Sequence, residues 1–281
     1  MSALPPGAID LYRSFIGRTE AARQYLDPVS LKRFLTVLGE NGEAPAALPA
    51  MTHWAYFLPL PSNDEIGEDG HPRRGGFLPP VALPRRMFAS GSSEFHAPLR
   101  VGAEAECVTR IVDVAHKDGR SGELVFLELE KTISQGGEAC VVERQTIVYR
   151  GDGARVPPVE PAPEAGAGGD AVWWPGPVDL FRFSAVTFNG HRIHYDAPYA
   201  ADVEGYPGLV VHGPFTASKL CRLAAGMRPG RAMASFAFRA VAPLFCGQPV
   251  RLRAEAGEDG LALSAIRQDG KVAVAAQASF H

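Results

Sequence analysis

The segment FRAVAPLFCG, residues 238–247, repeats the pattern of FHAPLRVG, residues 95–102. Both contain Pro-Leu-x-x-Gly, and each belongs to a half of the chain with three stretches of β-branched or alternating apolar residues separated by glycine-containing turns. This repeated order predicts two copies of one α+β unit. The stretches are 106–116, 123–134 and 139–150 in the first copy, and 250–260, 261–270 and 271–280 in the second.

A segment of Gly, Pro, Ala and acidic residues, 151–170, separates the two copies. It has little apolar surface to bury on ordering, so we expect a semi-extended linker. We therefore place a first unit at residues 1–150 and a second unit at residues 171–281.

Each copy also contains a candidate helix. In the second copy the helix is GPFTASKLCRLAAGM, residues 213–227, with Gly213 as the predicted N-cap and Pro214 as the first helical residue. Small and apolar residues recur in it at helical spacing, so a sheet could wrap around it. In the first copy Asp27 is the predicted N-cap before Pro28, and one apolar stripe follows, formed by Val29, Leu31, Phe34, Leu35 and Leu38.

Composition limits the class of protein. The chain has 281 residues, 46% hydrophobic and 21% charged, with a formal net charge of −3, which is typical of a globular protein and does not favour nucleic acid as a partner. The start of the chain lacks the features of a signal peptide, and no apolar run is long enough to cross a membrane, so we expect a cytoplasmic location. The four cysteines form no Cys-x-x-Cys pair and predict small buried side chains rather than disulfides or a zinc site; they are Cys107, Cys140, Cys221 and Cys246.

The densest group of polar residues lies in FSAVTFNGHRIHYDAPYA, residues 183–200. Such a loop is either a solvent-facing turn or a reaction site. The second possibility gains support from YPGLVVHGPF, residues 206–215, because this element leads into a helix N-terminus whose free N–H groups can polarise a carbonyl oxygen. A base beside such a site favours carbonyl chemistry. The candidate residues of the loop are Asn189, His191, Arg192, His194 and Asp196.

Two segments, FNGHRIHYDAPYA (188–200) and GLVVHGPFTASKL (208–220), resemble the MaoC-type hydratase branch of the hotdog fold. The motif of that branch is Asp-x-Asn-Pro-x-His-x-Asp, followed by His-Gly at the start of the central helix. Residues 69–92 and 119–130 resemble the fatty-acid-synthase-like dehydratase half of 3-hydroxyacyl-thioester dehydratases and of mesaconyl-C4-CoA and itaconyl-CoA hydratases. The resemblance spans nearly the whole chain. It implies an α+β double hotdog, two fused units in each of which a curved antiparallel sheet wraps a long helix.

The resemblance also implies the chemistry, which is the reversible addition of water to the 2,3-double bond of an enoyl thioester. It makes His194 the general base toward water and the acid toward C2, and it makes the backbone amide of Gly213 the donor to the thioester oxygen. Asn189 stands at the position of the motif's catalytic aspartate, so we expect it to hold the water rather than accept a proton. Asp196 matches the motif aspartate, while His191 and Arg192 replace its asparagine and proline. No metal or redox cofactor is implied.

Other residues are candidates for substrate binding. The pairs Arg85-Arg86 and Arg73-Arg74 match the geometry of CoA phosphates or of a substrate carboxylate, although each pair could equally be solvated. Arg182 is expected in an alternating strand, pointing toward the cleft, and His212 is a further candidate for which packing or capping is the stronger interpretation. Four aromatic residues could line an acyl tunnel or form ordinary core: Trp54, Phe57, Trp173 and Trp174.

Three function classes remain. The favoured one is a hydratase or dehydratase, acting on a short dicarboxylic acyl-CoA such as mesaconyl-C4-CoA or itaconyl-CoA, with a 3-hydroxyacyl thioester on CoA or acyl-carrier protein as the alternative. The others are a hotdog thioesterase and a non-catalytic acyl-thioester binding protein. Fusion supplies the second hotdog within one chain, so we expect a monomer or a homodimer.

Overall fold

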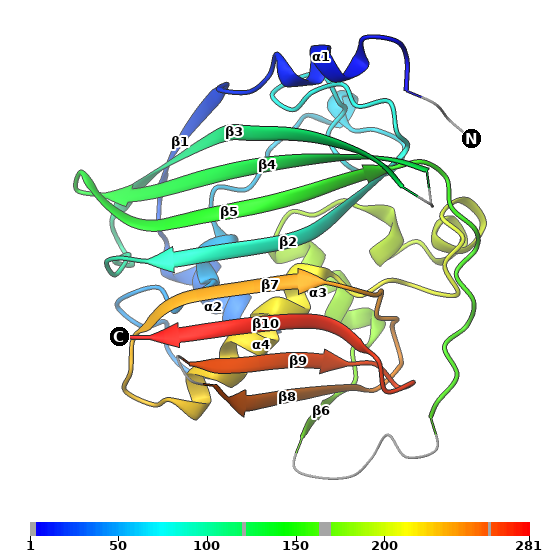
Figure 1. Ribbon diagram of the computed structural model, residues 1–281. Helices are drawn as coiled ribbons and strands as arrows, with labels where there is room; N and C mark the ends of the chain where they lie inside the picture. Colours follow the sequence, from blue (N-terminus) through cyan, green and yellow to red (C-terminus); the bar gives the residue numbers. More distant parts are fainter. Residues whose placement is uncertain (1–3, 120–121, 163–169, 258–259) are drawn as a thin grey trace.

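The computed structural model describes residues 4–119, 122–162, 170–257 and 260–281. Its centre is a ten-stranded antiparallel sheet in the order β1-β3-β4-β5-β2-β7-β10-β9-β8-β6 (Figure 1). The first half contributes β1 (Thr19–Tyr25), β2 (Arg85–Phe95), β3 (Glu104–Gly119), β4 (Gly122–Gln135) and β5 (Glu138–Arg150). The second half contributes β6 (Ala171–Trp173), β7 (Met233–Ala240), β8 (Val250–Ala256), β9 (Leu261–Ile266) and β10 (Val272–Phe280). All six strands expected from the sequence are present.

The two halves repeat one topology. Outward from the middle of the sheet, the first half runs β2-β5-β4-β3-β1 and the second runs β7-β10-β9-β8-β6, so every strand has a counterpart in chain order. The halves join where β2 pairs with β7. There Ser92 lies opposite Ala237, and each stands six residues before the proline of its own Pro-Leu-x-x-Gly copy. The repeat in the sequence therefore marks equivalent positions across this junction, and the predicted double hotdog is confirmed.

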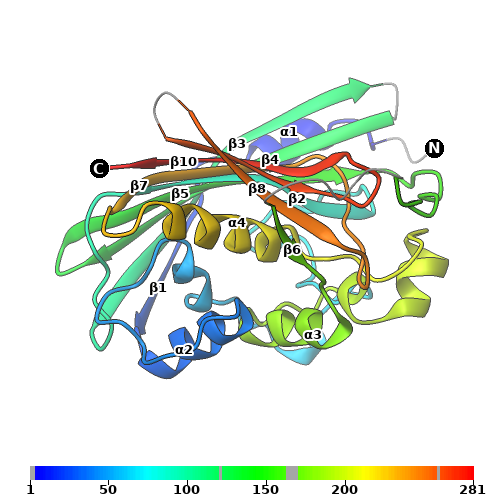
Figure 2. The same cartoon turned by 90° about the horizontal axis from the view of Figure 1, so that it is seen from below.

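The helix α4 (Gly213–Met227) is the central helix of the second half. It lies directly against the sheet (Figure 2) and contacts β8, β9 and β10. Its fully buried side chains include Phe215, Leu220 and Cys221. The N-cap is His212, so the helix begins at Gly213, one residue earlier than the sequence predicted.

The helices α2 (Pro28–Val37) and α3 (Pro177–Val186) are counterparts of each other. Each has ten residues, starts with proline and follows the first strand of its half. The two helices pack together, and the rings of Phe34 and Phe183 lie 5.8 Å apart. In α2 the Asp27 cap is confirmed, because its Oδ1 accepts a hydrogen bond from the backbone N–H of Ser30, but Val29 is exposed rather than part of the buried stripe.

The sequence analysis expected a long helix wrapped by the sheet in each half, and this holds for the second half only, because α4 has no counterpart in the described part of the first half. Between α2 and β2, residues 38–84 form loops with two short 3-10 turns, Thr52–Ala55 and Asn63–Glu65, and a short helix α1 (Ala8–Arg13) lies outside the sheet near β3. The concave face of β1–β5 is therefore only partly filled, and a cavity of about 1310 Å³ opens there. Residues from both halves line this cavity.

The expected linker lies along the second half as far as the structure describes it. The backbone N–H of Val156 donates to the Gly205 carbonyl at 2.8 Å, and that of Ala162 donates to the Gln268 carbonyl at 2.9 Å. Residues 163–169 of the expected linker lie outside the described residues, and the boundaries of the two units stay a prediction.

All four cysteines are free thiols, three of them buried. Among the described residues, no helix is both long enough and apolar enough to cross a membrane.

Candidate functional site

Four histidine rings form a row beside the cavity. The rings of His194 and His212 are stacked with centroids 3.6 Å apart, His191 lies 5.3 Å from His194, and His71 lies 4.2 Å from His191. Three of them belong to the loop between α3 and α4. The fourth, His71, comes from the first half and was missed as a site residue, because nothing near it in the sequence indicates that its loop meets the histidine loop.

His194 is held in the neutral state with one ring nitrogen free. Its Nδ1 lies 2.7 Å from the carbonyl oxygen of Val210, an acceptor, so Nδ1 carries the proton and Nε2 is bare. Burial lowers the pKa of His194 to about 4, although the bond to Val210 acts in the opposite direction. The side chain lines the cavity. A neutral imidazole in this position can accept a proton from a bound molecule.

The N-terminus of α4 faces the same cavity. Gly213 and Pro214 both line it. The backbone N–H of Gly213 precedes the first turn of the helix and has no acceptor among the described residues, so it is free to donate to an oxygen in the cavity. The positive end of the helix dipole strengthens that donation.

Asn189 shapes the histidine loop and also lines the cavity. Its Oδ1 accepts a hydrogen bond from the backbone N–H of His191 at 3.0 Å, and its own backbone N–H donates to the Ser184 carbonyl at 2.8 Å. The amide Nδ2 forms no hydrogen bond with another described residue and can donate to a water molecule, and Oδ1 keeps a second lone pair that can accept from one.

Arg192 and Asp196 position the loop and do not line the cavity. The Arg192 guanidinium donates to Asp196 Oδ2 from Nε at 3.0 Å and from Nη2 at 2.7 Å, and it stacks over Tyr199 at 4.1 Å. Arg192 also donates to the Glu68 carbonyl at 3.1 Å, which joins the loop to the first half. Both were expected to bind substrate, and the structure instead pairs the charge of each with that of the other.

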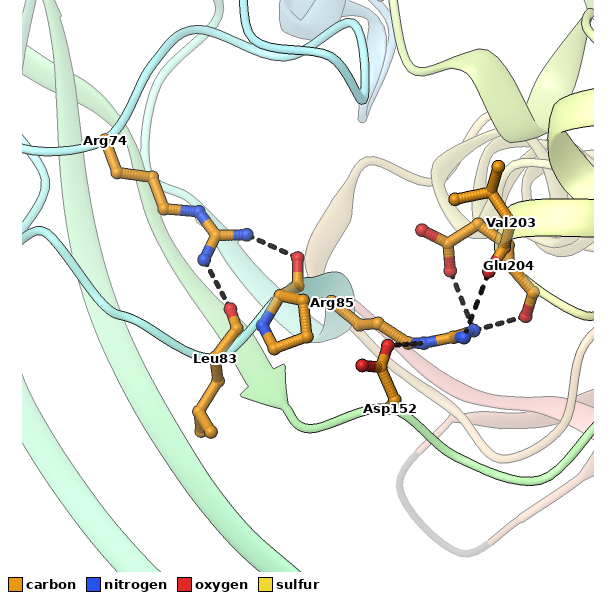
Figure 3. Close-up of polar contacts among 7 residues, drawn as sticks. Arg74, Leu83, Arg85, Asp152, Val203 and Glu204 are labelled. Atoms are coloured by element: carbon orange, nitrogen blue, oxygen red, sulfur yellow. Dashed lines mark hydrogen bonds and ion pairs between the residues drawn. The ribbon is translucent and has the colours of Figure 1, made fainter. Parts of the chain in front are cut away.

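The guanidinium groups of Arg85 and Arg74 likewise form their hydrogen bonds and ion pairs with other residues of the protein (Figure 3). Arg85 is buried, pairs with the Glu204 carboxylate at 2.9 Å and with Asp152 at 3.4 Å, and also bonds to the Glu204 carbonyl. Arg74 lines the cavity but donates to the Pro84 carbonyl at 2.6 Å and to those of Val81 and Leu83. Arg85, which was expected to bind substrate, ties β2 to the second half and does not line the cavity.

Arg86 differs from its neighbour. It lines the cavity, it is half-buried, and it forms no hydrogen bond or ion pair with another residue in the part of the chain that the structure describes. It lies near His71 and His191. Burial is the main cause that lowers the pKa of both histidines, to about 2 for His191, and the positive charge of Arg86 adds to it.

Two further residues that were expected to contact substrate, Arg182 and His212, lie outside the lining of the cavity. Arg182 lies on the exposed face of α3, so it belongs to a helix rather than an alternating strand and does not line the cavity. His212 packs behind the cavity, 1% exposed, with its Nε2 2.8 Å from Ser184 Oγ. His191, by contrast, does line the cavity.

The aromatic candidates divide into two groups. Trp54 and Phe57 line the cavity. The Trp54 ring packs edge-on against Phe88 and Phe238, and its Nε1 donates to Glu143 at 2.6 Å. Trp173 packs against Phe215 in the core, whereas Trp174 is exposed.

A row of polar residues crosses the inner face of the first half, and sequence reasoning missed it. Neighbouring members face each other in adjacent strands: Glu20 with Thr109, Thr109 with Lys131, and Lys131 with Glu143. The first three line the cavity, while Glu143 is buried against His53 and Trp54. The sequence did contain a signal for this row, because its polar residues stand at inward-facing positions of strands whose other inward residues are apolar.

In this double hotdog a neutral imidazole base and a free helix amide share one cavity, which suits chemistry on an acyl thioester. A model of the family "Hydroxyacyl-thioester dehydratase type 2" matches residues 51–246. The chain belongs to this family.

The names of two similar proteins agree with this family assignment. The mesaconyl-C(4)-CoA hydratase of Chloroflexus aurantiacus is 45% identical over 274 residues, which cover 94% of this chain and 96% of the relative. The mitochondrial hydroxyacyl-thioester dehydratase type 2 of Schizosaccharomyces pombe is 25% identical over 71% of this chain and 75% of its own.

Solved structures agree at the level of the fold. HtdX of Mycobacterium tuberculosis superposes with a TM-score of 0.68 at 19% identity, covering 94% of this chain and 100% of the other. A MaoC-like dehydratase from Phytophthora capsici gives a TM-score of 0.67 at 17% identity, covering 97% and 98%.

Proposed function

We propose that this protein hydrates a short enoyl-CoA that carries a second carboxylate, of the mesaconyl-C4-CoA type. One observation carries the proposal: the bare Nε2 of His194 and the free N–H of Gly213 open into the same cavity. The relative of 45% identity named mesaconyl-C(4)-CoA hydratase supports the choice of substrate.

The proposed reaction is a reversible syn addition of water. His194 Nε2 takes a proton from water as the water oxygen bonds to C3, the electrons of the C2–C3 double bond move toward the thioester, and the thioester oxygen gains negative charge. The Gly213 amide donates to that oxygen, and His194 then returns the proton to C2. Asn189 Nδ2 holds the water. The reaction as written needs no metal or redox cofactor.

The unpaired cation of Arg86 supports a carboxylate on the acyl group. A guanidinium that is half-buried in a cavity is stabilised by an anion, and a substrate carboxylate provides one with matching geometry. His191 lies close enough to Arg86 for the two to frame that carboxylate together. Arg73, exposed and bonded to the Ile66 carbonyl at 3.3 Å, is left for the outer part of CoA.

The other parts of the proposal concern location, assembly and the alternative substrate. The bacterial relative of 45% identity supports a cytoplasmic location, and we place the protein there as a monomer of fused halves or a homodimer. The alternative substrate is a 3-hydroxyacyl thioester without a second carboxylate, on CoA or on acyl-carrier protein. The relative from Schizosaccharomyces pombe favours that alternative by its name.

The test measures loss of the conjugated enoyl absorbance, and release of free thiol, with mesaconyl-C4-CoA, crotonyl-CoA and a crotonyl carrier-protein thioester. We expect absorbance to fall without thiol release, fastest with mesaconyl-C4-CoA. His194→Ala should lower kcat roughly 10²–10⁴-fold with an unchanged circular dichroism spectrum. Thiol release by the wild type would indicate a thioesterase, tight binding without turnover would indicate a binding protein, and near-normal turnover by His194→Ala would remove His194 from the mechanism.

A further inference from the structure

Ser184 and His212 form a hydrogen-bonded pair at the wall of the cavity. Ser184 Oγ lies 2.8 Å from His212 Nε2. Ser184 lines the cavity, whereas His212 lies behind it, stacked on the ring of His194 and in contact with the tilted ring of Phe183. The serine is therefore the member of the pair that a bound molecule can touch.

The direction of this hydrogen bond follows from the second nitrogen of His212. His212 Nδ1 is buried and has no hydrogen-bond partner among the described residues. A proton on Nδ1 would be an orphaned buried donor, which folded proteins rarely contain. The ring therefore carries its proton on Nε2 and donates it to Ser184 Oγ.

The hydroxyl proton of Ser184 is then free. Within the described residues Ser184 Oγ has no other partner, and it does not bond back to a carbonyl of its own helix, as Thr187 Oγ1 does to Phe183. A hydroxyl that accepts from Nε2 can still donate its own proton, and the cavity is the open direction. Burial keeps the pKa of His212 well below its usual range, so the ring stays neutral.

The N-terminus of α4 offers the cavity fewer backbone N–H donors than a helix start without proline would. Gly213 offers one N–H to the cavity, but the next residue, Pro214, has none. Stabilisation of a developing oxyanion commonly uses two donors. A side-chain hydroxyl held by the residue directly before Gly213 is placed to add a second donor to the acyl group.

We propose that Ser184 contacts the substrate and donates its hydroxyl hydrogen bond to an oxygen of the acyl group, with His212 as the positioning residue that fixes this direction. The acceptor is the thioester oxygen or the second carboxylate. This inference rests on the proposed function, because it requires that an acyl group fills the cavity beside His194.

The first measurement needs no variant. Long-range ¹H–¹⁵N NMR of the wild-type protein reports which nitrogen of His212 carries the proton, and we expect protonated Nε2 and bare Nδ1. A proton on Nδ1 would overturn the inference, because Ser184 would then give its proton to the histidine. This result is independent of any substrate, so it separates a failure of the inference from a failure of the proposed function.

The second measurement is kinetic, with a matched control. Ser184→Ala should lower kcat by a factor on the order of 10², and Ser184→Thr, which keeps the hydroxyl, should restore most of it. The control is Ser218→Ala. Like Ser184, Ser218 is a buried helical serine, but its hydroxyl has no partner in the described ranges and it does not line the cavity. Equal effects of Ser184→Ala and Ser218→Ala would overturn the inference. A loss with both crotonyl-CoA and mesaconyl-C4-CoA identifies the thioester oxygen as the acceptor, and a loss with mesaconyl-C4-CoA alone identifies the carboxylate.

Discussion

His194 combines two properties that an exposed histidine lacks. Its tautomer is fixed by the Val210 carbonyl, and burial keeps the ring uncharged at neutral pH. The first property leaves Nε2 as the bare nitrogen, the second keeps it unprotonated at neutral pH, and both depend on neighbours rather than on the histidine itself. The aspartate-to-asparagine departure at Asn189 is consistent with this arrangement, since a single imidazole can carry the proton in both directions.

The pH dependence of activity tests the state of His194. Because the pKa of His194 is lowered to about 4, the base stays unprotonated as the pH falls from 8 to 5, and kcat/KM should be flat over that range. The measurement is kcat/KM against pH, corrected for the folded fraction by circular dichroism. Half-maximal activity near pH 6.5 would show that the catalytic base has an ordinary pKa.

Arg86→Gln tests the recognition of the second carboxylate. Removal of the guanidinium should raise KM for mesaconyl-C4-CoA at least tenfold, a cost of about 1.4 kcal/mol or more, and change KM for crotonyl-CoA little. Arg182→Gln, on the exposed face of α3, is the matched control and should change neither value. Equal losses on both substrates with Arg86→Gln would assign the residue to the CoA part instead.

At the scale of elements, the histidine loop depends on a loop of the first half. The Arg192 N–H donates to the Asp69 carbonyl at 3.0 Å. Gly70 adopts a positive φ of 84°, and a side chain on it would lie 1.8 Å from the Gly190 carbonyl oxygen. The two loops therefore meet backbone to backbone, and this contact brings His71 beside His191.

Gly70→Ala should separate these loops. The added methyl group meets backbone atoms that cannot move independently, so we expect the free energy of unfolding to fall by roughly 2 kcal/mol and kcat to fall with it. Gly76→Ala in the same loop region is the control, because its Cβ would meet nothing within 4 Å and its φ is not positive. Chemical denaturation and steady-state kinetics measure both effects. Wild-type behaviour of Gly70→Ala would show that the loops do not need this approach.

At the scale of the molecule, the two halves have divided their tasks. The second half keeps its central helix and supplies His194 and Gly213, whereas the described part of the first half has no such helix and supplies most of the space for the substrate. One continuous hydrophobic core includes α2 and α4 together. The site therefore exists only in the assembled pair.

The buried neutral histidines predict a loss of stability in acid. The pKa values of His191 and His194 are lower in the folded protein than in the unfolded chain, near 6.5, so unfolding takes up protons below that pH. Their contribution to the free energy of unfolding is fully present above pH 6.5 and is lost as the pH falls toward 4. For His194 alone this loss is about 3 kcal/mol. Urea denaturation at pH 7.5, 6.5, 5.5 and 4.5 measures the slope. His191→Gln should reduce the slope and exposed His96→Gln should not; a stability that is constant from pH 7.5 to 4.5 would contradict the prediction.

The sequence alone determined the repeated strand order, the central helix and the histidine loop, because alternation, turn glycines, proline at a helix start and a short motif are all local features. It misread α3, because residues 181–184 alternate apolar and polar side chains as a strand does. Only the tertiary structure decided which polar groups face the cavity. Arg85 and Arg86 are neighbours in the chain, yet Arg85 pairs with Glu204 whereas Arg86 lines the cavity. His71 meets His191, and Ser184 meets His212, only in the folded chain. Such contacts join residues far apart in sequence, so their geometry depends on how the two halves pack and not on any local pattern.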